Sequence, residues 1–362
     1  MGIWSFVGGK RWEKDRFIAN IETECYVSNE PDRVFRLEED DLLTPGLIDF
    51  HCHPWAPGSP AMGNVADQLL ASIGISAYAD GGTFGYPGWE AADRFWRATS
   101  FGEVRSLLNI RPEGFTKLEN PLPTKAKDIS IDRVVEMIKK SGGRIIGVKV
   151  VLGQAEDKEE DLRILKAARE AADMADTVIG VHITNTFLSL EEISSHMKSV
   201  DIIIHPFHGE RGTALQKDGT YSPTMVKMQQ AGIIIDTAVG KSHLSWKVAR
   251  AAFEQGFHPD VISSDQSTSG WHNNKTLRDL PHILSAFIAG LEMPLDEAFR
   301  CVLTKPGQIL GINQNYDESL LLLEKKVGRT AFPDTYGQII EGDFEYLPGI
   351  VIRLGKAILQ PA

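Results

Sequence analysis

Apolar runs alternate with amphipathic stretches along most of the chain, from about residue 45 to residue 311. The runs are short enough for strands, and the stretches between them carry apolar residues at helical spacing. The expected strands are 47–53, 76–80, 103–110, 144–151, 177–183, 201–206, 232–239 and 260–264. The expected helices are 65–73, 89–99, 131–140, 158–174, 190–197, 222–231, 245–255, 277–291 and 295–310.

This alternation predicts the fold class. Strongly apolar strands separated by helices indicate a parallel sheet that is covered on its outer face. Eight strand–helix pairs favour a closed (β/α)8 TIM barrel over an open, doubly wound sheet. The first expected strand is not followed by a glycine-rich dinucleotide fingerprint, which also disfavours the open sheet. We therefore expect an α/β chain built around a TIM barrel.

The two ends of the chain do not share this rhythm. Residues 1–44 contain short β-like pieces, and so do residues 337–354. Because chain termini often lie close together, the two ends are expected to pair. The predicted organisation is a small β-sandwich-like sheet domain from residues 1–44 and 312–362, beside a (β/α)8 barrel at residues 45–311. Residues 312–336 give no firm expectation of their own.

Composition narrows the class of protein. Among 362 residues, Asp and Glu number 49 and Lys and Arg 38, and the net charge of −11 argues against a dedicated nucleic-acid binder. Three cysteines without paired spacing fit a reducing compartment. No secretory signal is evident, and no run approaches the ~20 apolar residues that span a bilayer. We expect a cytoplasmic protein with a small-molecule substrate and no membrane partner, and the sequence leaves a homo-oligomer open.

Candidate metal ligands lie where the expected strands end, which is the edge at which barrel active sites are built. His51 and His53 are two residues apart, so on a strand both imidazoles share one face and can hold one cation. Zinc accepts such ligands readily. Cys52 faces the other way and is read as packing. A surface or core histidine pair is as common as a metal-binding one, but the position at a strand end favours the metal.

Lys149 lies inside the apolar run GVKVV, where a charged amine is costly to bury. One interpretation is a lysine that is salt-bridged or that snorkels to solvent. The other is a lysine whose pKa falls on burial, so that the neutral amine takes up CO₂. The resulting carbamate is an anionic ligand that can bridge two metal ions. The second interpretation is preferred only because other candidate ligands are present.

His182, His205 and Asp265 each end a further expected strand. A single histidine at such a position is more often a hydrogen-bonded core residue, and a single aspartate is commonly a turn cap. Together with the first histidine pair, the three favour metal binding. Asp265 is placed to contact a metal ion and to accept a proton from a bound water.

The segment TPGLIDFHCH, followed by Lys149, His182, His205 and Asp265, resembles the amidohydrolase superfamily over about residues 44–311. The chain is most similar to the dihydroorotase/hydantoinase-like branch, and within it to the deacetylase group. The resemblance implies that His51 and His53 bind one metal, His182 and His205 a second, and that carboxylated Lys149 bridges both. It implies that Asp265 touches the first metal and is the catalytic proton shuttle. Two divalent ions are implied, zinc by default, with manganese or cobalt as substitutes.

The function expected is a binuclear metal-dependent hydrolase that cleaves an amide or ester of a small acidic substrate through a metal-bridging hydroxide. A cyclic amidase of the dihydroorotase or hydantoinase type is the main alternative. A nucleobase deaminase is disfavoured because such relatives usually lack the lysine, and a metal-free scaffold because no ligand is missing. Substrate contacts are expected from loops, with Lys241 and His243 as further candidates beside the main set of Asn185, His208, Arg211 and His272. Arg211 is either a carboxylate-binding residue or a solvated loop charge.

Overall fold

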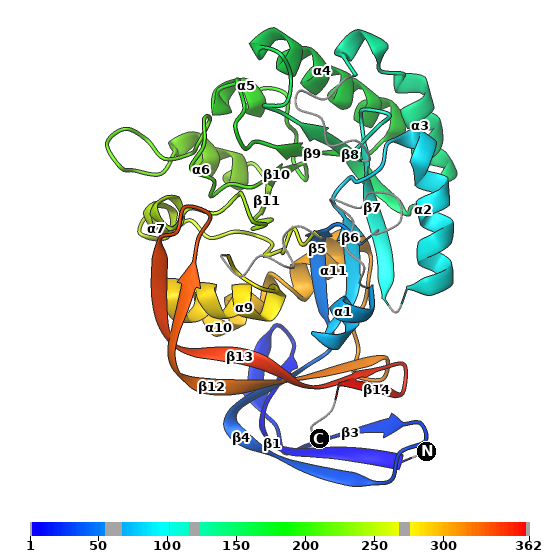
Figure 1. Ribbon diagram of the computed structural model, residues 1–362, viewed down its shortest axis with the longest axis vertical. Coiled ribbons are helices and arrows are strands. Elements are labelled where there is room, and N and C mark those ends of the chain that lie inside the picture. The colour runs from blue at the N-terminus through cyan, green and yellow to red at the C-terminus, as the bar shows by residue number, and fades with distance from the viewer. Residues whose placement is uncertain (1, 55–66, 101, 116–123, 268–275, 360–362) are drawn as a thin grey trace.

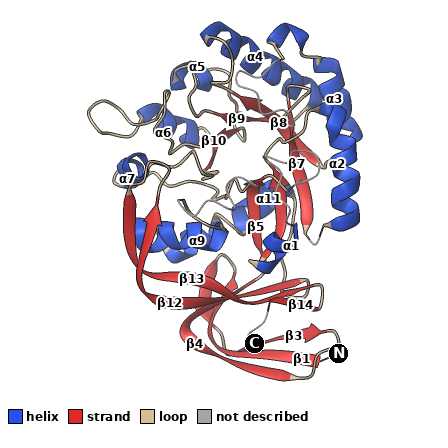
Figure 2. Ribbon diagram, in the orientation of Figure 1, coloured by secondary structure: helices blue, strands red, loops and turns tan. Residues whose placement is uncertain are grey.

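Two seven-stranded sheets organise the chain, as Figures 1 and 2 show. The computed structural model describes residues 2–54, 67–100, 102–115, 124–267 and 276–359. One sheet comes from the middle of the chain and is surrounded by helices. The other is formed by segments from both ends of the chain. The fold is therefore mixed α/β, as the alternation in the sequence predicts.

The central sheet is parallel throughout and has the strand order β11-β10-β9-β8-β7-β6-β5. Every residue of β5 and β6 is buried, as expected for strands that are covered on both faces. The sheet curls and fits a TIM-barrel-like fold (Figure 2). Its strands are β5 (Leu47–Cys52), β6 (Ile75–Asp80), β7 (Glu103–Asn109), β8 (Ile145–Val151), β9 (Val178–His182), β10 (Ile202–Ile204) and β11 (Ile234–Asp236).

Helices follow the strands and cover the outer face of the sheet (Figure 2). Side chains along β10 point alternately to the two faces of the sheet. Ile202 and Ile204 pack in an inner apolar cluster, whereas Ile203 packs in the cluster that includes residues of the helices. The α-helices are α1 (Asp67–Ser72), α2 (Tyr86–Thr99), α3 (Ile131–Lys140), α4 (Lys158–Ala175), α5 (Leu190–Ser194), α6 (Pro223–Gln230), α7 (Trp246–Phe253), α9 (Leu280–Ser285), α10 (Leu295–Arg300) and α11 (Thr304–Leu310). A 3-10 turn, η1 (Ala126–Asp128), precedes α3, and a π-helical turn, η2 (Ala286–Gly290), follows α9.

The eighth expected strand, 260–264, is not a strand in the structure. It makes isolated parallel bridges instead, from Val261 to Asp236 of β11 and from Gln266 to Cys52 of β5. Backbone hydrogen bonds join the segment to both neighbours, as from the Val239 N–H to the Ser263 carbonyl and from the Asp265 N–H to the His51 carbonyl, but two of its own N–H groups donate to side chains. The Ser263 N–H donates to Thr237 Oγ1 at 3.0 Å, and the Ser264 N–H donates to Asp49 Oδ1 at 3.0 Å. This segment therefore lies between β11 and β5 without a regular ladder.

The single helix expected over 295–310 is also interrupted. Pro306 has no N–H, so the carbonyl of Val302 cannot accept the usual helical hydrogen bond from the residue four positions later. That carbonyl accepts from the Ile48 N–H of β5 instead, at 2.9 Å. The chain accordingly ends α10 at Arg300 and begins α11 at Thr304. The break joins this part of the chain to the first strand of the parallel sheet.

The second sheet has the order β14-β13-β12-β4-β1-β2, and β3 pairs with β1. The two ends of the chain meet where β4 pairs antiparallel with β12, in the register Leu322 to Leu43. The range 312–336, which carried no firm expectation, contains the whole of the long strand β12. The strands are β1 (Gly2–Glu13), β2 (Arg16–Ala19), β3 (Glu22–Val27), β4 (Arg33–Thr44), β12 (Ser319–Pro333), β13 (Ile339–Arg353) and β14 (Lys356–Leu359).

The β12–β13 hairpin extends beyond this sheet and ends beside α7 (Figure 1). At its tip, Asp334 Oδ2 accepts from the backbone N–H of Trp246 at 2.9 Å, and the Trp246 indole donates to the carbonyl of Phe332 at 2.8 Å. Tyr336 reaches further, to a loop that follows β10. The terminal sheet thus contacts loops at the edge of the parallel sheet. Among the described helices, none is long and apolar enough to cross a membrane.

Candidate metal centre

The structure brings the predicted ligands together at the carboxyl ends of the parallel strands. All six side chains are buried or nearly so, with Asp265 11% exposed. His51 lies in β5 and His53 directly follows it, Lys149 lies in β8, His182 ends β9, His205 follows β10, and Asp265 follows the segment after α7. The sequence predicts that His51 and His53 share one face of the strand and that Cys52 lies on the other. In agreement with this, Cys52 packs in the apolar core between the sheet and the helices.

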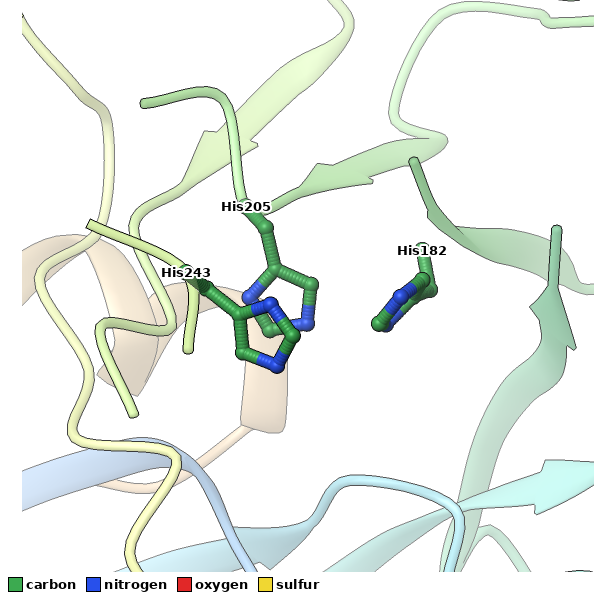
Figure 3. Close-up of side chains that lie close together, drawn as sticks. All are labelled: His182, His205 and His243. Atoms are coloured by element: carbon green, nitrogen blue, oxygen red, sulfur yellow. The ribbon is translucent and has the colours of Figure 1, made fainter. Parts of the chain in front are cut away.

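Two groups of three side chains have potential ligand atoms within 4.8 Å of one another, namely His51, His53 and Asp265, and His182, His205 and His243. In the first group, His53 Nε2 lies 3.1 Å and His51 Nε2 lies 3.7 Å from Asp265 Oδ1. The second group is drawn in Figure 3, where His182 and His205 come from the ends of neighbouring strands and His243 comes from a loop.

The two groups adjoin and form one continuous site. The ring centroids of His51 and His205 are 5.7 Å apart. Asp265 reaches both groups, because its Oδ2 lies 3.6 Å from His243 Nε2. Lys149 Nζ lies 3.4 Å from His51 Nε2. A carboxylate, a lysine and five imidazoles therefore face one another in a buried space.

The first histidine pair is oriented by side chains behind it. His51 Nδ1 contacts Asp236 Oδ2 at 3.1 Å. His53 Nδ1 contacts Thr83 Oγ1 at 2.7 Å, and the Thr83 hydroxyl donates to Asp80. Because that hydroxyl proton is committed to Asp80, Thr83 accepts from His53 Nδ1–H. The lone pair of His53 is then on Nε2, which faces Asp265. Such outer contacts are typical of metal-binding histidines.

The second group shows the same arrangement. His205 Nδ1–H donates to the carbonyl of Ala238 at 2.6 Å, which leaves the lone pair on Nε2. His243 Nδ1 contacts Thr184 Oγ1 at 2.9 Å. Burial holds the pKa of His51, His182 and His205 well below the ordinary histidine value. A neutral imidazole is the form that binds a metal, so the donor set fits divalent cations.

Lys149 is neither snorkelling nor salt-bridged in the described part of the chain. The residue is 1% exposed, and within the described residues no carboxylate lies within ion-pair distance of its Nζ. Burial lowers the pKa of the Lys149 amine to about 8. A substantial fraction of the amine is then neutral near physiological pH. Of the two interpretations of the sequence, the structure favours the lysine with a lowered pKa.

Three glycines allow the ligands to approach the backbone closely. A Cβ atom on Gly81 would lie 2.2 Å from His51 Nε2, and one on Gly82 would lie 2.6 Å from Lys149 Cβ. On Gly240 it would lie 2.4 Å from Asp265 Oδ2. Two of the ligands themselves have left-handed backbone, His205 with φ 70° and Asp265 with φ 48°. Such strain is often found at functional sites.

The four predicted substrate contacts have different surroundings. Arg211 donates to the carbonyl of Asn185 through Nη2 at 2.7 Å, and its guanidinium lies 3.5 Å from the ring centroid of Phe187. It thus joins the loops that follow β9 and β10. The His208 ring is fully buried, and its Nδ1 accepts from the N–H of Glu210 at 3.2 Å. His272 lies outside the described residues.

Sequence reasoning did not place His243 and Asp236 among the residues that build this centre. His243 was only a loop candidate for substrate, since it lies several residues beyond its strand. Asp236 ends β11 much as His182 ends β9, so its position at a strand end was an available signal. Its carboxylate also accepts from the Ser263 hydroxyl, which links β11 to the irregular eighth segment.

No family model matches the chain. A protein named deacetylase from Brucella anthropi is 23% identical over 317 residues, covering 87% of this chain and 76% of that protein. A deacetylase from Agrobacterium fabrum is also 23% identical, over 323 residues, covering 88% of this chain and 76% of the relative.

Solved structures share the fold. A dihydroorotase superposes with a TM-score of 0.81 at 18% identity, and an adenine deaminase with 0.82 at 16%, each covering 98% of both chains. A D-hydantoinase from Thermus sp. gives 0.58 at 13% identity, covering 99% of this chain and 95% of that chain. The solved structures show that the chain shares their fold, and the two relatives agree with the predicted similarity to deacetylases.

Proposed function

We propose that this protein is a metal-dependent amidohydrolase, which binds two divalent ions and removes an acyl group from a small acidic substrate by hydrolysing an amide or ester bond. The names of the two curated relatives support a deacetylase-like reaction. The observation that carries the proposal is the pair of adjoining three-residue groups, in which potential ligand atoms lie within 4.8 Å of one another.

His51, His53 and Asp265 would hold one ion, and His182 and His205 the other, with Lys149 between them as a carbamate. Carbamate formation joins the neutral Nζ to the carbon of CO₂ and releases one proton, so the product carries a negative charge. Two divalent ions, zinc by preference, supply Lewis acidity and make water acidic near neutral pH. The buried Lys149 amine supports this assignment, because its charged form has no ion-pair partner among the described residues.

Asp265 is the proposed general base and acid. Its two oxygens face different histidines, Oδ1 toward His53 and Oδ2 toward His243, so the carboxylate is held in the middle of the site. From there it can take a proton from the attacking water and pass it to the leaving amine or alkoxide. The left-handed backbone of this residue fixes the direction in which the carboxylate points.

Arg211 is the proposed partner of a substrate carboxylate. Its Nε donates hydrogen bonds to the carbonyls of Asn185 and Thr186, and its Nη2 donates to that of Asn185. The guanidinium is therefore held in one orientation. Within the described residues, nothing hydrogen-bonds its Nη1, and the side chain is exposed to solvent. A charge-assisted hydrogen bond from this nitrogen would select acidic substrates. We assign the hydrolase activity to residues 45–311, and a supporting role to residues 1–44 and 312–362.

A hydrolysis screen with the zinc-loaded protein tests this function. The compounds are N-acetyl amino acids, O-acetylated hydroxy acids, hydantoins and dihydroorotate. Turnover of linear acetyl compounds, with none of the cyclic ones, is expected. Turnover of hydantoin or dihydroorotate alone would instead identify a cyclic amidase and refute the deacetylase-like proposal.

Asp265→Asn provides a test of the proton-transfer step. The amide keeps an oxygen that can contact a metal but cannot accept the proton, so kcat should fall about 10²- to 10⁴-fold. Zinc content, measured by elemental analysis, should stay near that of the unmodified protein. Parallel loss of zinc and activity would show that Asp265 acts mainly as a ligand.

A further inference from the structure

We propose that His243 is a third histidine ligand of the second metal ion, beside His182 and His205 and in addition to the proposed Lys149 carbamate. This inference rests on the proposed binuclear function. It adds a ligand that the resemblance to the superfamily does not supply. Figure 3 shows the three rings converging from the ends of β9 and β10 and from the loop after β11.

The orientation of His243 matches that of the other candidate ligands. Its Nδ1 is held by Thr184 Oγ1 at 2.9 Å, so its Nε2 is the nitrogen directed toward the site. The ring centroid lies 3.8 Å from that of His205 and 5.2 Å from that of His182. A histidine that only bound substrate would not need a ring nitrogen within 4.8 Å of the potential ligand atoms of both His182 and His205.

A role limited to holding Asp265 fits the distances less well. The separation of 3.6 Å between His243 Nε2 and Asp265 Oδ2 is longer than a hydrogen bond. A cation held among the three imidazoles would satisfy His243 Nε2 without this contact. His243 is only 17% exposed at its side chain, so its Nε2 also has little access to bulk water.

The backbone beside His243 is held in place by the C-terminal hairpin. The Leu244 N–H donates to Thr335 Oγ1 at 3.2 Å, and the Thr335 N–H donates to the Leu244 carbonyl at 3.1 Å. Metal ligands need this kind of support, because a site that is too loose by about 1 Å loses its function. The β12–β13 hairpin, which lies outside the parallel sheet, thus fixes the loop that carries His243.

Three neutral imidazoles have a chemical consequence. They form the three-histidine donor set of catalytic zinc sites, to which the proposed Lys149 carbamate would add an oxygen. Imidazole nitrogen favours zinc, copper, nickel and iron, whereas carboxylate and water oxygens favour magnesium and manganese. The second ion should therefore be zinc rather than magnesium or manganese, while the first site, which contains Asp265, is less selective.

The test is metal binding by the full chain, measured without any substrate. Zinc affinity is determined by chelator competition, and the ligand field by the visible absorption of the cobalt-substituted protein. In His243→Ala, one ion should bind as in the unmodified protein, and the other should bind at least 10-fold more weakly, with altered cobalt bands. Thr184→Val keeps the imidazole but removes its anchor, and a smaller loss of the same ion is expected.

Lys241→Ala is the matched control, since Lys241 is exposed on the same loop. It should bind both ions as tightly as the unmodified protein. If His243→Ala also binds two ions with unchanged affinity and unchanged cobalt bands, His243 is not a ligand, while the binuclear proposal stands. If the unmodified protein itself binds fewer than two ions, the binuclear proposal fails, and the assignment of His243 fails with it.

Discussion

At the scale of single residues, the positions of the proposed ligands depend on small neighbours that leave room for them. His51 Nδ1 contacts Asp236 Oδ2 at 3.1 Å, and the opposite side of the ring, at Nε2, lies against the backbone of Gly81. A Cβ atom on Gly81 would lie only 2.2 Å from His51 Nε2. The imidazole cannot keep its present place beside any larger residue.

Gly81→Ala should therefore displace the His51 ring and weaken the binding of the first metal ion. A loss of about 10- to 100-fold in zinc affinity is expected, in the range seen when the surroundings of a ligand are altered. Chelator competition measures this loss, and thermal unfolding of the metal-free protein checks that the fold is retained. Unchanged affinity for both ions would show that His51 is not needed where we place it.

Several residues of the site were predictable because they lie at the ends of apolar runs. His182 and His205 follow this rule, and the structure places both in one group of potential ligands. His243 does not follow it, since it lies on a loop whose course depends on contacts with Thr335, about ninety residues further along the chain. The spacing of apolar and polar residues near His243 carries no information about a contact between residues so far apart in the chain.

At the scale of elements, the segment 261–266 shows how side chains can substitute for a strand. The Ser264 hydroxyl donates to the fully buried carboxylate of Asp49, and the Ser264 N–H donates to the same group. Burial raises the pKa of Asp49 to about 6, against the effect of these hydrogen bonds. The hydroxyl thus compensates part of the cost of burying a carboxylate and fixes the segment that carries Asp265.

Ser264→Ala should leave this carboxylate with one hydrogen bond fewer. The free energy of unfolding is expected to fall by about 1–3 kcal/mol, the usual cost of an unsatisfied buried polar group. Chemical denaturation measures the difference, and a double-mutant cycle with Asp49→Asn shows whether the two residues are coupled. Additive effects in that cycle would mean that their contact contributes nothing.

Apolar alternation predicted the positions of β5 to β11 but not the irregular parts. The spacing of apolar residues indicates which positions are buried, and residues 261–263 are as buried as those of a strand. Its backbone is nevertheless bonded to Thr237 and Asp49 side chains, which periodicity does not encode. Pro306 was a local indication that the helix over 295–310 would break, because proline removes a helical hydrogen bond.

At the scale of the whole molecule, the two sheets are linked by the β12–β13 hairpin. Tyr336 Oη lies 2.9 Å from Glu210 Oε1 and accepts from the N–H of Gly209 at 3.1 Å. Both residues belong to the loop after β10, which also carries Arg211. The terminal sheet thereby helps to position the proposed substrate-binding loop, a contact that the separate patterns of the two regions could not predict.

Tyr336→Phe should loosen this loop and leave the rest of the fold intact. Lys217 is exposed in the loop, so limited trypsin digestion should cut there several-fold faster, with little change in the global unfolding temperature. Tyr26→Phe is the matched control, because Tyr26 is an exposed tyrosine of the same sheet. Equal cleavage rates in the two variants would contradict a positioning role for Tyr336.

The order in which the chain is made gives the hairpin another consequence. A ribosome releases every proposed ligand, through Asp265, well before it has made residues 319–353, which form β12 and β13. Until then, β4 lacks a partner on one side, and the loops after β10 and β11 lack their outer support. The nascent protein therefore holds all of its proposed ligands before the loops after β10 and β11 are supported, and these loops take their final form only after residues 319–353 have been made and have folded against them.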